Sequence, residues 1–152
     1  MIEIKKNNKC DTRTCNVYEV NKEKLLSNTK LHIEDVSKGM NMLATEMQLR
    51  ALNHDYTKLI DIDGFYKDFQ TGFETIDWWT KHQKEERHHF NNQEYIQEDV
   101  NLIDIIEQIV DGVMAGMARS GRYRQENISP ELLLKAYNNT VKLLLSNVRV
   151  VE

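Results

Sequence analysis

Residues 33–54, with the sequence IEDVSKGMNMLATEMQLRALNH, decide how the long central part of this chain folds. Apolar residues recur in it at a spacing of seven, and two more lie on the same face: Ile33, Met40 and Met47, with Val36 and Leu43. This is the period of an amphipathic helix that buries one face. The next position in the series is His54, so a histidine stands where the pattern predicts a buried apolar residue.

The rest of the chain has the same helical character. Its 152 residues are the length of one ordinary domain, and they include only 6 Gly and 1 Pro. We therefore expect residues 1–152 to form a single all-α domain, a compact bundle of about five to six helices. Residues 21–53 follow the helical period in a short first piece and then a long one. The first 20 residues alternate like strands and predict a small N-terminal β-hairpin.

A separate helix is predicted for residues 129–147. Ser129 has the chemistry of an N-cap, and Pro130 suits the first helical position. The apolar residues of this helix would close the bundle or face another subunit, so a homo-oligomer is one expected state.

Composition excludes several classes of function. No apolar run is long enough for a membrane span, and the N-terminus lacks the apolar part of a secretory signal. We therefore expect a soluble, cytoplasmic protein, in which Cys10 and Cys15 stay reduced. The net charge of −4 argues against general nucleic-acid binding. It leaves room for small anions, which need only a local basic pocket.

His54 and the adjacent Asp55 form the first candidate site. A histidine on a buried face must have both ring nitrogens satisfied, by hydrogen bonds or by a metal ion. A buried histidine beside a turn aspartate is the simpler interpretation of one such pair.

Three further histidines follow in IDWWTKHQKEERHHFNN, at positions 82, 88 and 89. If this segment is one helix, His82 and His89 share a face, and the neighbours His88 and His89 cannot both point at one centre. An exposed polar helix face is the alternative interpretation.

The segment EDVNLIDIIEQIVDGVMAGMA supplies carboxylates on a separate stripe, at Asp104, Glu107 and Asp111. A broad apolar face is predicted on the same helix, made by Ile103, Ile106, Val110, Val113 and Met117. A solvent-facing acidic stripe is one interpretation. If the helix is buried, its carboxylates must be paired, protonated or bound to a metal.

Taken in chain order, these residues resemble the HD-domain superfamily of metal-dependent phosphohydrolases over positions 32–111. HDYTK is similar to the His-Asp-x-x-Lys form common there, and the wider pattern is similar to small HD-like proteins of bacteria and their phages. The resemblance implies a metal site made by His32, His54, Asp55 and Asp111. It implies a second metal or a substrate position at His82 and at His88 or His89.

The resemblance implies a divalent transition metal, one or two ions of Mn, Fe, Co, Ni or Zn, which suits mixed imidazole and carboxylate ligands. Lys58 is the candidate for stabilising substrate charge. Glu107, one helical turn before Asp111, is either the general base or a residue that orients the ligands.

The expected activity is hydrolysis of a phosphomonoester or phosphodiester in a small anionic substrate, with a nucleotide as the family-based expectation. Arginines around Gly121 are candidates for binding its phosphate: Arg119, Arg122 and Arg124. A soluble loop is the alternative interpretation of this run. The alternative function is a non-catalytic HD-like module that binds a partner.

Overall fold

The computed structural model describes residues 1–6, 18–74, 77–125 and 127–152. It confirms the all-α prediction, with one small sheet added. The helices are α1 (Lys22–Asn53), α2 (Tyr56–Ile60), α3 (Ile62–Gln70), α4 (Trp78–Glu85), α5 (Leu102–Ser120) and α6 (Pro130–Asn147), with a 3₁₀ turn at Gln93–Tyr95. The chain forms two compact units, Met1–Thr45 with Lys142–Glu152, and Glu46–Val141.

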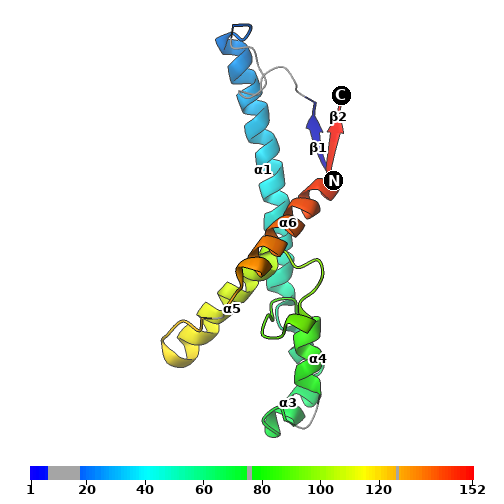
Figure 1. The fold of residues 1–152 in the computed structure, drawn as a ribbon, viewed down its shortest axis with the longest axis vertical. Helices are drawn as coiled ribbons and strands as arrows, with labels where there is room; N and C mark the ends of the chain where they lie inside the picture. Colours follow the sequence, from blue (N-terminus) through cyan, green and yellow to red (C-terminus); the bar gives the residue numbers. More distant parts are fainter. Residues whose placement is uncertain (7–17, 75–76, 126) are drawn as a thin grey trace. The chain divides into compact units, whose positions relative to one another are not determined.

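The sheet in the first unit pairs the two ends of the chain. Strands β1 (Ile2–Lys5) and β2 (Val148–Val151) run parallel, with Ile2 opposite Val148 (Figure 1). The predicted N-terminal hairpin differs from this arrangement. Its turn and the first two residues of its second strand lie outside the described residues, and Tyr18–Val20 are not a strand. The strand pattern was correct for β1, but sequence alternation does not specify a partner far along the chain.

Helix α1 is continuous, without the predicted break after its first piece. The Asn21 side chain caps it by accepting a hydrogen bond from the Lys24 amide. The prediction that its apolar face is buried is wrong for the described residues, because Ile33 and Met40 are 61% and 62% exposed. The helical period shows which residues share a face, but it does not show whether that face meets a neighbour.

The core of the second unit joins α5, α6 and the segment before α5. Its buried members are Phe90, Val100, Ile105, Leu132 and Ala136. Helix α6 begins as predicted, because the Ser129 hydroxyl accepts a hydrogen bond from the Leu132 amide at 3.1 Å. No helix in the described part of the chain is both long enough and apolar enough to cross a membrane.

The first turn of α5 is fixed by buried polar contacts. Asn101 and Asp104 form a capping box. The Asp104 carboxylate accepts a hydrogen bond from the Asn101 amide, and the Asn101 side chain accepts one from the Ile103 amide. Arg87 donates to both carboxylate oxygens of Asp104 at 2.9 Å. This two-point contact ties the segment after α4 to the start of α5 and sets the position of the following turns.

Helix α5 turns its carboxylate side inward, so the interpretation of a solvent-facing acidic stripe is wrong for Asp104, which is 0% exposed. The predicted apolar face is instead partly exposed, with Val110 and Met117 at 49% and 55%. Pairing with arginine and histidine offsets the cost of burying these carboxylates.

Candidate metal centre

The His-Asp pair lies at the corner where α1 ends. Asn53 is the last residue of α1, and Asp55 adopts a left-handed backbone with φ of 56°. Aspartate tolerates this conformation better than most residues. The chain therefore turns at Asp55 before α2 begins at Tyr56, and both side chains of the pair reach the same region.

A first ligand group consists of His54, His88 and Asp111. The Nε2 atom of His54 lies 3.8 Å from Asp111 Oδ1 and 3.7 Å from Asp55 Oδ2. These distances are too long for hydrogen bonds. They fit two ligand atoms that share an ion, because two bonds of roughly 2.1 Å span at most about 4.2 Å.

Glu107 lies near the Nδ1 atoms of both histidines of this group. His54 Nδ1 lies 2.9 Å from Glu107 Oε1, and His88 Nδ1 lies 3.3 Å from the same oxygen. Burial alone would raise the pKa of Glu107, but the two imidazoles lower it to about 2, so it is a carboxylate and accepts. His54 therefore carries a proton on Nδ1. The hydrogen bond to Glu107 and the nearby carboxylates raise the pKa of His54, so a metal ion bound at Nε2 would take the place of a proton there.

A second ligand group consists of Asp55, His82 and His89. The Nε2 atoms of His82 and His89 lie 3.0 Å apart, and His82 Nε2 lies 3.3 Å from Asp55 Oδ1. His82 is 1% exposed, and its ring stacks against the rings of Trp78 and Trp79. Burial and repulsion from its histidine neighbours lower the pKa of His89 to about 3, so this ring is neutral.

Thr57 and Glu86 determine which His82 nitrogen carries a proton. The Thr57 hydroxyl donates to Glu86 Oε1 at 2.7 Å and lies 2.6 Å from His82 Nδ1. A hydroxyl has one proton, so Thr57 must accept from His82 Nδ1. Neutral His82 then presents a lone pair at Nε2, facing Asp55.

Asp55 lies between the two groups. Its Oδ2 accepts a hydrogen bond from Lys58 Nζ at 2.5 Å. Burial would raise the pKa of Asp55, but His82 and Lys58 outweigh it and hold that pKa well below its usual range. Asp55 is therefore a carboxylate at neutral pH. Its Oδ2 lies 3.7 Å from His54 Nε2, and its Oδ1 lies 3.3 Å from His82 Nε2 and 3.7 Å from His88 Nε2, so it is near members of both groups.

Three buried atoms at this point have no hydrogen-bond partner among the described residues: Asp55 Oδ1 and both ring nitrogens of His88. Asp55 Oδ1 and His88 Nε2 lie 3.7 Å apart. A buried carboxylate oxygen and a buried imidazole nitrogen are costly to leave unpaired. The Nε2 atoms of His54 and His82 also lie beside Asp55, at 3.7 Å and 3.3 Å from its carboxylate oxygens. The donor set therefore fits one or two divalent cations.

His88 and His89 both reach the centre because they are not helical. Helix α4 ends at Glu85, and the next residues form turns. The prediction that adjacent histidines cannot both contribute assumed one helix through this segment. His88 joins the first group, and His89 joins the second.

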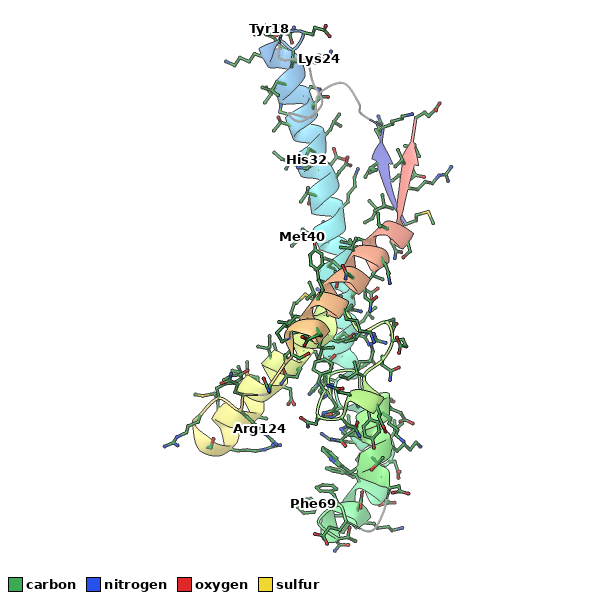
Figure 2. All side chains as sticks on the ribbon, in the orientation of Figure 1. Tyr18, Lys24, His32, Met40, Phe69 and Arg124 are labelled. Carbon is green, nitrogen blue, oxygen red and sulfur yellow. The ribbon has the colours of Figure 1, made fainter. Side chains whose placement is uncertain are left out.

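His32 is a member of neither ligand group found among the described residues. It lies on the part of α1 that belongs to the first unit, 21 residues before the last residue of that helix, Asn53 (Figure 2). The ligand role that the family resemblance implied for His32 stays a prediction.

Sequence reasoning missed three residues that position the ligands: Thr57, Glu86 and Arg87. Thr57 stands in HDYTK and Glu86 and Arg87 stand just before the paired histidines. Their closeness to candidate ligands was the available signal. The predicted phosphate-binding residues Arg119, Arg122 and Arg124 line a pocket at the end of α5.

No protein-family model matches the chain, and no curated protein and no solved structure shows significant similarity to it. The HD-domain resemblance of HDYTK and the residues after it stays a prediction.

Proposed function

We propose that this protein is a metal-dependent phosphohydrolase that uses one or two divalent transition-metal ions to hydrolyse a small phosphate ester, with a nucleotide as the expected substrate. The observation that carries the proposal is the convergence of unpaired acceptor atoms on one place. Asp55 Oδ1 and His88 Nε2 are buried without partners among the described residues. The Nδ1 atoms of His54 and His82 donate hydrogen bonds to Glu107 and Thr57, which leaves the Nε2 atoms on the side of the centre.

The arrangement suits a catalytic metal more than a packing role. In a purely structural cluster, the same nitrogens would donate to neighbouring carboxylates. Here Glu107 and Thr57 engage the far side of two rings, which is how proteins orient histidine ligands toward a metal. Imidazole and carboxylate together favour Mn, Fe, Co, Ni or Zn over Mg or Ca.

A bound ion of this kind polarises a phosphoryl oxygen and lowers the pKa of bound water toward neutrality. Around that chemistry, Lys58 supplies a fixed positive charge beside Asp55, where it can stabilise charge on a phosphoryl group. It lies 5.5 Å from the centre of the Trp79 ring, which restricts its position. Glu107 is already engaged by His54, so its role is to orient ligands.

The test compares His54→Ala, Asp111→Asn and His32→Ala with the wild type. Metal-free protein is titrated with Mn²⁺ and Zn²⁺ by calorimetry. It is then assayed with p-nitrophenyl phosphate, bis-p-nitrophenyl phosphate and nucleoside mono- and triphosphates. We expect metal-dependent hydrolysis by the wild type, loss of tight metal binding and hydrolysis in the first two variants, and neither loss in His32→Ala.

His32→Ala is a matched control, since it removes an imidazole from the helix that leads to His54. Metal binding by the wild type with no hydrolysis of any of these substrates would favour the non-catalytic binding module. Unchanged metal binding in His54→Ala would contradict the proposed centre itself.

A further inference from the structure

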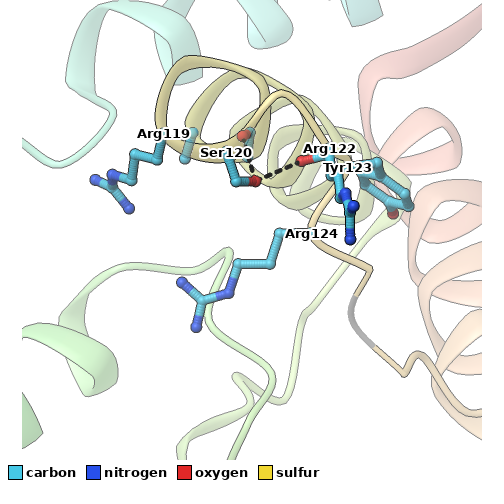
Figure 3. Close-up of a pocket in the computed structure, with 7 residues that line it drawn as sticks. Arg119, Ser120, Arg122, Tyr123 and Arg124 are labelled. Atoms are coloured by element: carbon cyan, nitrogen blue, oxygen red, sulfur yellow. Dashed lines mark hydrogen bonds between the residues drawn. The ribbon is translucent and has the colours of Figure 1, made fainter.

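A pocket of about 260 Å³ lies where the chain reverses direction at the end of α5 (Figure 3). Gly121 ends the helix with a left-handed backbone, φ 66°. The walls come from the last turns of α5 and from the segment after it. They include Ala115, Gly116, Arg119, Arg122, Tyr123 and Arg124.

The returning segment is held closely against α5. The Arg124 amide donates a hydrogen bond to the Gly112 carbonyl at 3.3 Å. A Cβ atom at residue 116 would lie 2.4 Å from the Arg122 carbonyl oxygen, and one at residue 112 would lie 2.8 Å from that of Arg124. Glycine is therefore needed at both positions, and the backbone that carries two of the arginines is anchored.

The pocket concentrates positive charge on an acidic protein. Three arginines line it, whereas the chain as a whole has a net charge of −4. Among the described residues, no carboxylate forms an ion pair with Arg119, Arg122 or Arg124. Figure 3 shows the side chains of Arg119 and Arg124 extending to the same side of the pocket. Guanidinium groups in this setting suit a phosphate or another oxyanion.

The size and place of the pocket restrict the ligand further. Sites that hold a whole small molecule usually measure roughly 300–1,000 Å³, so this pocket fits an anionic group better than a complete nucleotide. Arg119 lies eight residues after Asp111 on α5, which is about 12 Å along the helix and roughly 80° around it. The backbone of Arg124 reaches Gly112, the residue next to Asp111.

We propose that Arg119, Arg122 and Arg124 bind a second anionic group of the same substrate, apart from the phosphoryl group at the metal centre. This inference rests on the proposed function. It narrows the substrate to compounds with at least two phosphoryl groups, such as a nucleoside triphosphate.

The first experiment measures pyrophosphate binding to the metal-free protein by calorimetry, so it does not depend on activity. We expect binding that weakens roughly tenfold in each of Arg119→Gln, Arg122→Gln and Arg124→Gln, from the loss of one charged hydrogen-bonding group. Arg149→Gln, which removes an exposed arginine from β2, should bind like the wild type. No pyrophosphate binding, or equal binding in the arginine variants, would overturn the proposal.

The second experiment uses the Mn²⁺-loaded protein with a nucleoside monophosphate and the matching triphosphate. Each arginine variant should raise KM for the triphosphate roughly tenfold and leave KM for the monophosphate unchanged. For a nucleotide that is not hydrolysed, its inhibition constant against p-nitrophenyl phosphate replaces KM. Unchanged triphosphate values beside lost pyrophosphate binding would mean that the pocket takes a free anion, and would overturn the substrate assignment.

The two proposals can fail separately. Absence of metal binding or of hydrolysis would contradict the proposed function, and pyrophosphate binding would still test the pocket. Normal metal binding and hydrolysis without pyrophosphate binding would contradict only the proposed role of the pocket.

Discussion

The two ligand groups differ in what a metal ion would have to displace. In the first group, His54 Nε2 lies 3.7 and 3.8 Å from its carboxylate neighbours, with no hydrogen bond between them. In the second, the Nε2 atoms of His82 and His89 are 3.0 Å apart, close enough to share a proton. An ion entering the second group must break that contact. We therefore expect the first group to bind a metal ion more tightly. The types of the ligand residues alone do not predict which of two sites has the higher metal affinity.

The largest effect is expected for Asp55→Asn, because Asp55 has an oxygen near each group. The substitution keeps the shape and removes the charge, so both ions should be lost. Elemental analysis after equilibration with Mn²⁺ should find no bound metal. One retained equivalent would show that Asp55 belongs to a single group.

Separate substitutions should remove the sites one at a time. Asp111→Asn should abolish the tight site, and His89→Gln should abolish only the weak one. Calorimetric titration with Mn²⁺ would show which binding phase disappears in each variant. If His89→Gln removed the tight phase, the ranking of the two groups would be reversed.

A smaller effect on metal affinity is expected for Glu107→Gln, since Glu107 contacts a ligand residue, His54, and not the ion itself. Loss of such a contact typically lowers metal affinity roughly 10- to 100-fold. The tight phase should weaken by this amount while the weak phase is unchanged. Glu85→Gln is the matched control, because Glu85 is exposed on α4 and forms an ion pair with Lys81 at 3.8 Å.

Thr57→Val tests the matching contact in the second group. Without the hydroxyl, His82 loses the acceptor that keeps its proton on Nδ1, so the weak phase should weaken by up to about tenfold. Thr57→Ser restores the hydroxyl and should restore the affinity. Equal weakening in both variants would point to packing as the cause.

The smallest effect is expected on how the stability of the metal-free protein varies with pH. The pKa of Glu107 falls to about 2 from 4.5, so its contribution to stability is complete above pH 4.5 and is lost as pH falls toward 2. The hydrogen bond from His54 to Glu107 raises the pKa of His54 above 6.5, so its contribution is complete below pH 6.5 and is lost as pH rises through the folded value. The difference in Tm between wild type and Glu107→Gln should be largest between pH 4.5 and 6.5.

A difference that grew steadily toward high pH would argue against a charged pair. Measurements in a chelating buffer keep metal binding out of this comparison.

The sequence predicted the helices better than their surroundings. The period of α1 and the cap of α6 depend on local geometry, and both were correct. Burial of Ile33 and Met40 depended on distant neighbours, and that prediction was wrong for the described residues. The parallel partner of β1 lies at the opposite end of the chain, where local alternation carries no information.

The candidate centre shows the same division. His54, Asp55 and Asp111 could be selected because their residue types bind metals and their order resembles that of the HD-domain superfamily. His32 has the same chemistry but is in neither ligand group. His89 was doubtful only because α4 was expected to continue. Helix ends and hydrogen-bond partners therefore decide which candidates converge, and those depend on the folded chain.

The most direct test is a crystal structure of the protein soaked in Mn²⁺, with anomalous diffraction used to locate the ions. The account predicts a strong peak within bonding distance of His54 Nε2, His88 Nε2, Asp55 and Asp111, and a weaker one between Asp55, His82 and His89. No peak between these residues, with His54 and Asp111 hydrogen-bonded directly to each other, would contradict it.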